Sequence, residues 1–384
     1  MNSTVVSYFL QFEIVQAFVQ AASKTVGFDI TGVLTFAIFF LVAFIIVNIL
    51  AAVGGLGTYA ERKISADMQM RIGPNRVGPY GLLQFLADGV KMIMKEDILP
   101  TNADKFLFFI APMFCIVGVF ATLAVLPFSS GFALTHLDVG TFYLIAISSL
   151  VGLGVFLGGY ASNSKWSMLG GMRGASQIIS YEIPVTISVL GICLLSGSMA
   201  FNHIIENQGG LPHTWFIFHN PFSFIAFFVY FTGALAETNR APFDLPEAES
   251  ELVSGYHTEY SGMKFGFFAL AEYVEVFVVC GVASALFLGG YNVPFNVGGN
   301  TIIGQFLQLG GFVSKTLALY YVVIWIRWTL PRLRVDQLMT ICWKYLTPIA
   351  MFNLIGMAFW VYWFNGKSMF DLIFAASGHS AGGH

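Results

Sequence analysis

Four glutamates interrupt apolar stretches of the sequence that are long enough to cross a bilayer. Glu272 and Glu275 lie about two helical turns inside one stretch. Glu182 lies just inside a second stretch, and Glu237 ends a third. An ionised carboxylate at mid-membrane costs ~2.5–3.5 kcal/mol even on the lenient insertion scale. Each of these side chains therefore needs a proton, a partner or water, which makes each a candidate for proton transfer.

A segment rich in acidic residues, 237–260, precedes the stretch that holds Glu272. It reads ETNRAPFDLPEAESELVSGYHTEY, and Arg240 is the only lysine or arginine in it. Its carboxylates belong to Glu237, Asp244, Glu247, Glu249, Glu251 and Glu259. Taken alone, such a segment is typical of a solvated loop. Next to a stretch with embedded glutamates, it also offers them proton-exchanging neighbours.

The same segment contains the signals of a short helix. Asp244 and Glu247 have capping-box spacing, and Gly255 suits the end of a helix. We therefore expect a helix at about 245–254, with Glu247 and Glu251 on one face.

The chain lacks the residue patterns that hold a redox centre. Its histidines all fall in loops or the tail, at His136, His203, His213, His219, His257, His379 and His384. A b-type cytochrome would place haem ligands within its spans, so that class is excluded. The four cysteines form no CxxC pair, and neither a Walker A nor a dinucleotide motif occurs. We expect buried thiols and no metal site, so partners must supply any redox chemistry.

The composition indicates a membrane protein. Of 384 residues, 57% are hydrophobic and only 10% are charged, whereas soluble domains average roughly 25% charged residues. So few charges leave no polar shell for a water-soluble particle. The net charge of −3 gives no reason to expect a nucleic-acid partner.

The apolar stretches predict an all-α polytopic fold of about eight transmembrane helices, because a bilayer core of ~30 Å needs ~20 apolar residues in a helix. The stretches lie near 33–57, 106–128, 141–161, 179–199, 220–237, 265–289, 311–330 and 346–364. They define one membrane domain over 33–365. Gly154 and Gly158 form a GxxxG pair in the third stretch, which favours close helix packing.

Lysine and arginine predict the orientation. The first, third, fifth and seventh connections hold fifteen of the eighteen basic residues, and the other connections hold none. The positive-inside rule then places the odd connections in the cytoplasm and both termini outside. The embedded carboxylates fall in the cytoplasmic half, while Lys315 stands near the opposite edge. A one-sided polar cavity or half-channel explains this better than a structural ion-pair network, which is the alternative.

Two segments are predicted to lie along the membrane surface. Residues 81–96 place Gln84, Asp88, Lys91 and Lys95 in one polar stripe on an otherwise apolar helix. Residues 4–22 show a weaker amphipathic pattern within an N-terminal extension, 1–32. A further extension follows at 366–384.

The predicted cytoplasmic loops resemble a known family. The carrying motifs are Ala60–Lys63, Gln69–Gly78, Gly81–Glu96, Lys165–Arg173, Pro242–Leu252, Gly255–Gly262 and Pro331–Met339. Together they are similar to the loops of the H-type subunit of bacterial respiratory complex I, the proton-pumping NADH:quinone oxidoreductase. The resemblance runs from about residue 33 to 365.

This resemblance implies a subunit of an enzyme that works with quinone as substrate. NADH, FMN and the iron–sulfur clusters would be bound by partner subunits of the peripheral arm, next to other membrane-arm subunits in the inner membrane. By motif, the quinone chamber would involve Glu61, Arg62, Arg71, Asp88 and Arg240. An adjacent acidic proton path would comprise Glu182, Glu237, Glu247, Glu249, Glu251, Glu259, Glu272 and Tyr273.

Two alternatives remain open at the level of sequence. One is the equivalent subunit of a membrane-bound hydrogenase-type complex, although the long quinone-side loops argue against it. The other is a stand-alone ion channel or transporter, which would be active after purification without partners.

Overall fold

The chain is helical throughout the part that the structure describes. The computed structural model describes residues 31–133, 135–247, 249–294, 301–364 and 367–369. Its long helices are α3 (Thr31–Met68), α5 (Lys105–Val125), α6 (Gly140–Ala161), α7 (Lys165–Ser196), α9 (Pro221–Glu237), α11 (Gly262–Phe287), α12 (Ile302–Thr329) and α14 (Thr347–Phe364). Shorter helices are α4 (Gln84–Met94), α8 (Phe201–Glu206), α10 (Glu249–Leu252) and α13 (Val335–Thr340). No strand occurs in these residues, so the predicted all-α class is confirmed.

The helices suit a polytopic membrane protein. Among the described residues, seven helical segments are long and apolar enough to cross a membrane, and α9 is a shorter apolar helix of 17 residues. They follow the chain in the order of the eight predicted stretches. A π-helical segment, Ile341–Leu346, joins α13 to α14 into one continuous span.

Several helices extend beyond the apolar stretches from which they were predicted. α3 continues to Met68, so Arg62 and Lys63 lie in its last turns and not in a loop. α7 begins at Lys165 and includes the segment expected to form the third loop. A helix continues while its backbone hydrogen bonds are made, and polar side chains near a helix end do not stop it. The apolar stretches thus placed these helix ends too far inside the span.

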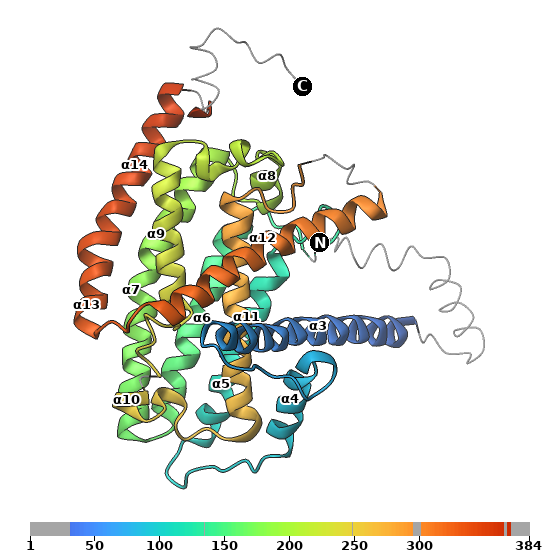
Figure 1. The fold of residues 1–384 in the computed structure, drawn as a ribbon, viewed down its shortest axis with the longest axis vertical. Helices are drawn as coiled ribbons and strands as arrows, with labels where there is room; N and C mark the ends of the chain where they lie inside the picture. The colour runs from blue at the N-terminus through green and yellow to red at the C-terminus, as the bar shows by residue number, and fades with distance from the viewer. Residues whose placement is uncertain (1–30, 134, 248, 295–300, 365–366, 370–384) are drawn as a thin grey trace.

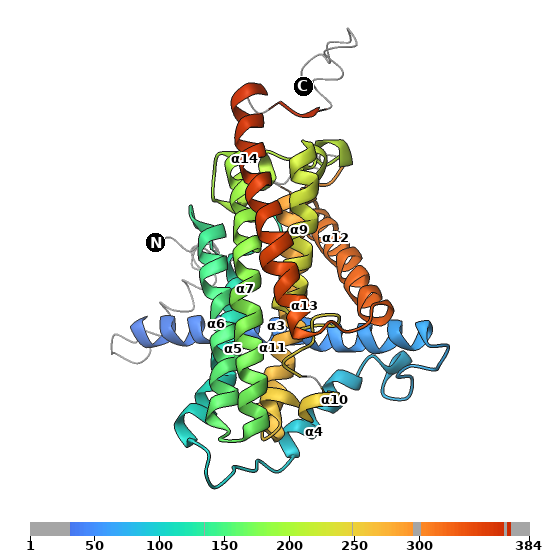
Figure 2. The ribbon, with the colours of Figure 1, turned by 90° about the vertical axis from the view of Figure 1, so that its left-hand side faces the viewer.

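The spans form an upright group that one helix crosses. In Figures 1 and 2, α7, α9 and α14 run side by side along the long axis, whereas α3 lies across the other helices. α11 runs through the middle and packs against α3, α5, α9 and α12. It is the most enclosed of the seven candidate spans: 61% of the residues in its most apolar part are buried, compared with 17% for α3. Polar side chains on α11 therefore face protein far more than lipid.

Small residues allow the central helices to approach closely. A Cβ added at Gly154 would lie 2.5 Å from the Cys115 Sγ and 3.0 Å from the Ala111 carbonyl oxygen on α5. One added at Gly158 would lie 3.1 Å from the Phe268 ring of α11. Both contacts bear out the close packing expected of the GxxxG pair. The four cysteines are free and buried, as predicted.

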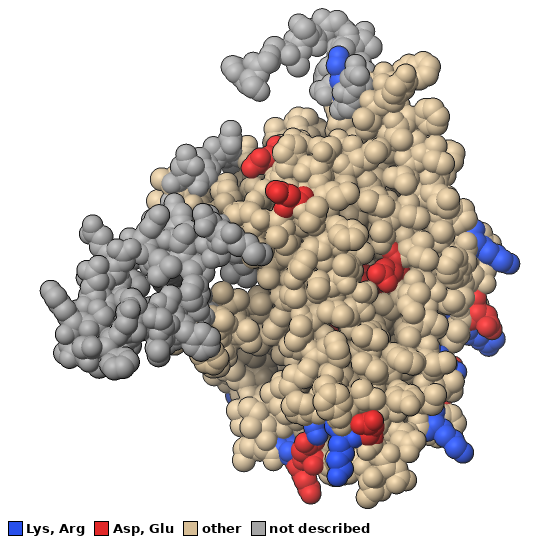
Figure 3. Space-filling view, turned by 180° about the vertical axis from the view of Figure 1, so that it is seen from behind, with Lys and Arg blue, Asp and Glu red and all other residues tan. Residues whose placement is uncertain are grey.

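Charge is unevenly spread over the surface. Figure 3, the view from behind, shows most blue side chains along the lower and right-hand edges, while the middle of that face is almost entirely tan. The basic loop residues occupy the same ends of successive spans, at the close of α3, α9 and α12 and the start of α5, α7 and α11. The predicted surface helix at residues 4–22 and the tail after Met369 lie outside the described residues.

Candidate functional site

Glu61 is the centre of a buried ion cluster. Its Oε2 accepts a hydrogen bond from Arg240 Nη1 at 3.1 Å, and its Oε1 accepts one from Arg327 Nη1. Glu61 and Arg240 are only 7% and 6% exposed. The three residues come from α3, from the segment after α9 and from α12, so the crossing of α3 over the bundle brings them together. A single carboxylate between two guanidinium groups leaves this cluster net positive.

Arg240 has donors to spare. Its guanidinium carbon lies 4.1 Å from the ring centre of Tyr273, which places one face of the group on an aromatic ring. Its Nε and Nη2 are buried and make no hydrogen bond to the described residues. Buried N–H groups without an acceptor are costly. Arg240 is therefore suited to bind an oxygen acceptor such as a carbonyl, a hydroxyl or a water.

The residue after Glu61 points the other way, toward the surface helix α4. Arg62 Nη1 lies 2.5 Å from Asp88 Oδ2, and Gln84 and Lys91 also donate to Asp88. Burial raises the pKa of Asp88, but the hydrogen bonds from Arg62 and Gln84 outweigh it and lower the pKa below the ordinary value. Gln84, Asp88 and Lys91 thus share one side of α4, as predicted, whereas Lys95 lies beyond the end of the helix. Successive residues differ by ~100° around a helix, so α3 can face the buried cluster and α4 at once.

Glu272 is held by the loop that precedes its own helix. The Tyr256 hydroxyl donates to Glu272 Oε1 at 3.0 Å, and the Glu247 carboxyl lies within hydrogen-bonding reach. Glu247 Oε1 is also 3.6 Å from His257 Nδ1. Burial raises the pKa of the Tyr256 phenol well above its usual range, so this hydroxyl remains a donor.

Close packing fixes this loop against α7. A Cβ added at Gly170 would lie 2.8 Å from the Tyr256 nitrogen, and the Ser167 hydroxyl donates to the Tyr256 carbonyl at 2.7 Å. Gly255 has φ +61°, and a Cβ there would overlap the Pro246 carbonyl. Glycine is required at this turn, and it directs Tyr256 toward Glu272.

Asp244 and Glu247 are the carboxyl groups of the acidic loop between α9 and α11 that turn toward the protein interior. Arg332 Nη2 donates to the Asp244 carbonyl and lies 3.7 Å from Asp244 Oδ1. Burial raises the pKa of Asp244, and the nearby Arg332 offsets only part of this effect. Burial likewise raises the pKa of Glu247, and the Asp244 carboxylate adds to the increase. Both groups therefore exchange protons at a higher pH than ordinary carboxyls do.

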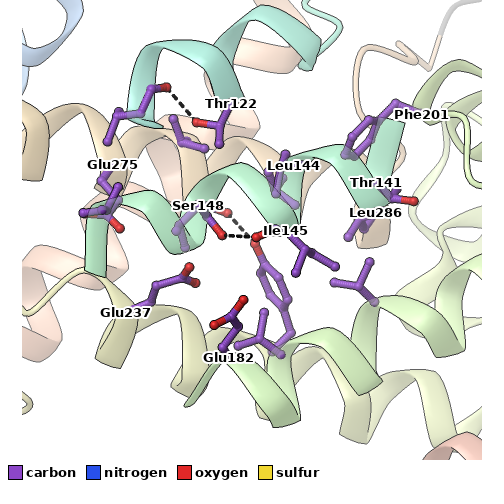
Figure 4. A pocket seen from close by; sticks show the side chains of 18 residues that line it. Thr122, Thr141, Leu144, Ile145, Ser148, Glu182, Phe201, Glu237, Glu275 and Leu286 are labelled. Carbon is purple, nitrogen blue, oxygen red and sulfur yellow. Dashed lines mark hydrogen bonds between the residues drawn. The ribbon is translucent and has the colours of Figure 1, made fainter. Parts of the chain in front are cut away.

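A second cluster of glutamate side chains lines an internal cavity. Glu182 on α7, Glu237 on α9 and Glu275 on α11 border a cavity of about 40 Å³. Figure 4 shows Glu182 and Glu237 side by side, with Glu275 toward the same end of the cavity. Both Glu275 oxygens are buried and accept no hydrogen bond from the described residues. About 10–15 Å³ of such space holds one water, so the cavity has room for more than one.

The structure brings most predicted site residues together. The residues that come together form two groups. The group around α3 contains Glu61, Arg62, Asp88, Arg240 and Tyr273. The group around α11 contains Glu182, Glu237, Glu247 and Glu272. Arg71 is exposed, and its Nε donates to Gln69. Glu259 is half-buried and makes no ion pair with the described residues. The Glu249 side chain lies outside what the structure describes.

The helix expected at about 245–254 is wrong in extent. α10 covers only Glu249–Leu252, and Gly255–His257 forms a separate 3₁₀ turn. Glu247 and Glu251 consequently do not share a face: Glu247 turns inward, while the exposed Glu251 pairs with Arg173 at 2.6 Å. Asp244 binds Arg332 and so caps no helix. The prediction assumed continuous helical spacing after Pro246. It did not take into account that these side chains bind partners far away in the sequence.

Five residues that contact the site were not among the predicted site residues: Asp244, Tyr256, His257, Arg327 and Arg332. Glu275, an embedded charge three residues after Glu272, was recognised as a candidate for proton transfer but was not assigned to the proton path. Tyr256 and His257 carried no signal in the sequence, since only the folded loop places them beside α11.

Comparison with known proteins gives a consistent result. The family model for NADH dehydrogenase matches residues 33–358. The chain is 42% identical over 361 residues to the H-type subunit of the NADH-quinone oxidoreductase of Anaeromyxobacter dehalogenans, and the match covers 88% of this chain and 87% of that protein. It is 50% identical over 313 residues to the H-type subunit of the Chlorobaculum tepidum enzyme, covering 79% and 87%. It is 46% identical over 331 residues to subunit 8 of the Rhodothermus marinus enzyme, covering 83% and 95%.

Proposed function

Since the chain belongs to the NADH dehydrogenase family, and its relatives above are membrane subunits of NADH-quinone oxidoreductase, we propose that it forms the membrane side of the quinone chamber and an adjacent glutamate path for protons. The chain acts as a membrane subunit of that oxidoreductase, and its partners are the other subunits. NADH, FMN and the iron–sulfur clusters belong to the peripheral arm, and quinone reaches this chain as substrate. The hydrogenase-type alternative gains no support from relatives with these names.

The chamber is assigned to the region between α3, α4 and the Arg240 cluster. A quinone needs donors for its two carbonyl oxygens and an apolar surface for its tail. Arg240 has two buried donors without a protein acceptor, and the Arg62–Asp88 pair joins α3 to the surface helix α4. The apolar residues Leu82, Leu83, Leu86, Val90 and Ile93 are exposed on α4 or just before it, beside that pair. Polar donors inside and apolar side chains outside suit a headgroup that enters before its tail.

The glutamate path is supported by one observation above all: carboxyl groups continue from the Arg240 cluster into the protein. Tyr273 on α11 packs against Arg240, and the adjacent Glu272 meets Tyr256 and Glu247. Glu275 is three residues further along α11, a spacing that puts two side chains on neighbouring positions of one helix surface. It borders the cavity shared with Glu182 and Glu237. A change in charge at the chamber would therefore alter the protonation of Glu272 and Glu275, either by proton transfer or by electrostatic interaction.

The alternation of basic residues between connections supports one orientation of the chain in the membrane. We assign the chain to the bacterial inner membrane, with the chamber and the basic ends of the spans on the cytoplasmic side and both termini on the periplasmic side. The peripheral arm then meets the face that holds α4, α10 and α13.

Glu272→Gln tests the path, because it keeps the size of the side chain and removes its titration. In assembled complex, both NADH:quinone turnover and proton translocation should fall several-fold. The turnover is normalised to NADH:ferricyanide activity, which reports the assembled peripheral arm. Asp336→Asn is the matched control. It neutralises an exposed carboxylate on α13 that belongs neither to the group around α3 nor to the group around α11, so the ratio should stay near wild type. An unchanged ratio with intact pumping in Glu272→Gln would contradict the proposed path.

A further inference from the structure

The cavity that holds the three glutamates continues away from them. Beyond Glu182, Glu237 and Glu275, its lining is aliphatic or hydroxylic, including Thr141, Leu144, Ile145, Val189, Val282 and Leu286. It ends at Phe201, the first residue of α8. Figure 4 shows this order, with Glu237 and Glu275 toward one end and Phe201, Thr141 and Leu286 toward the other.

A second pocket lies on the other side of Phe201. It has a volume of about 330 Å³ and is lined largely by polar residues from the segment that precedes α6, the segment that precedes α8, and α8 itself. Those residues include Thr135, His136, Asp138, Ser198, Asn202, His203 and Glu206. Phe201 is the residue that the two linings share, and its side chain is only 4% exposed. The aromatic ring thus separates a cavity with carboxylates from a polar pocket at the α8 end of the bundle.

Local structure holds the ring in this position. A Cβ added at Gly140 would lie 3.2 Å from the Phe201 Cδ2 and 3.2 Å from the Val125 Cγ1, so the ring rests where α6 begins without a side chain. The backbone N–H and the hydroxyl of Thr141 both donate to the Met199 carbonyl, at 3.1 and 3.0 Å. These bonds tie the segment before α8 to the start of α6. The ring can therefore leave the cavity mouth only if this segment shifts relative to α6.

An apolar constriction blocks ions and protons by excluding water. Proton transfer needs a continuous chain of waters or hydroxyl groups, and the aliphatic section offers few partners to hold such a chain. Water is retained at the carboxylate end, where polar partners are available. The geometry points to Phe201 as a hydrophobic gate: we propose that the glutamate cavity has a second mouth at the α8 end, through which protons pass when the ring moves. This inference rests on the proposed proton path and adds an exit to it.

The test uses sealed membrane vesicles that contain the assembled complex. Phe201→Ala removes the ring, so a pH gradient imposed without NADH should collapse several-fold faster than in wild type, while NADH:quinone turnover is retained. Phe201→Leu keeps an apolar side chain of useful bulk and should hold the gradient nearly as well as wild type. Phe201→Val, which should leak to an intermediate extent, replaces the alanine variant if that one does not assemble. Wild-type decay rates in both small variants would overturn the gate.

A double variant shows which route the protons take. Adding Glu237→Gln to Phe201→Ala should slow the leak back toward the wild-type rate, because Glu237 borders the same cavity. A leak that persists at full rate would mean damaged helix packing and not an open gate. Glu237→Gln alone separates the two claims. Normal pumping in that variant refutes the proposed path itself, whereas lost pumping together with a tight Phe201→Ala variant refutes the gate alone.

Discussion

At the scale of single residues, partners from other parts of the chain hold the buried carboxylates of Glu61 and Glu272. Glu61 is bound by arginines at 240 and 327, and Glu272 by a tyrosine that precedes its helix. A buried charge whose partner is removed costs much more than an exposed one, because water cannot replace the lost contact. The buried cluster and the surface pairs should therefore respond very differently to substitution.

Glu61→Gln tests this difference. The change leaves Arg240 and Arg327 without their carboxylate, and breaking a buried pair in this way costs about 3–5 kcal/mol. We expect a clearly lower thermal stability and a smaller amount of this chain in purified complex. Arg173→Gln breaks the exposed pair with Glu251 and is the matched control, for which little change is expected. Equal effects of the two substitutions would show that the Glu61 cluster is not a stabilising element.

Glu247 should contribute a pH dependence of known sign. Burial raises its pKa in the folded protein, so the folded state binds its proton more tightly than the unfolded state does. The contribution of Glu247 to stability is then fully present below the unfolded pKa of ~4.3 and is lost as the pH rises through the folded pKa. Glu247→Gln should flatten that fall when the melting temperature of the complex is followed against pH. A steeper or unchanged fall in the variant would count against a raised pKa.

The sequence identified the charged residues but not how they pair. Embedded charge made Glu182, Glu237 and Glu272 recognisable, and all three lie in the site. Pairing depends on the folded loop, however. Tyr273 neighbours Glu272 in sequence but packs on Arg240, while Tyr256, sixteen residues away, makes the hydrogen bond. Spacing along a chain predicts neighbours on one helix, not across helices.

At the scale of helices, hydropathy found the spans but misplaced their ends. Apolar stretches stop where lipid contact stops, whereas a helix stops where its backbone hydrogen bonds stop. For this reason α3 and α7 extend well past the predicted limits. The crossing of α3 over the bundle, which brings Glu61 to Arg240, has no counterpart in the sequence pattern because helix tilt is set by packing.

Glycines test whether close packing between helices is specific. Gly154→Ala would place a methyl group 2.5 Å from the Cys115 Sγ and should destabilise the α5–α6 contact by about 1–3 kcal/mol. Gly310→Ala on α12 is the control, because a Cβ there meets nothing within 4 Å, and alanine favours a helix more than glycine does. Thermal unfolding of the purified complex should separate the two variants. If Gly154→Ala is as stable as Gly310→Ala, the close contact has no energetic weight.

At the scale of the whole molecule, the two ends of the bundle differ in chemistry. One end carries the basic helix ends, α4 and the acidic loop. The other end holds α8 and the polar pocket beyond Phe201. Because the two ends differ, proton movement between them has a defined direction only if the molecule has one fixed orientation in the membrane.

Cysteine labelling tests that orientation. The native cysteines are all buried, so background labelling with a membrane-impermeant reagent should be low. Leu211 lies between α8 and α9 and is 47% exposed, so Leu211→Cys should react from the periplasmic side of intact spheroplasts. Trp166, near the start of α7, is 55% exposed, and Trp166→Cys should react only in inverted vesicles stripped of the peripheral arm. The reversed pattern would turn the molecule over, and the pocket beyond Phe201 would then open to the cytoplasm and serve uptake, not release.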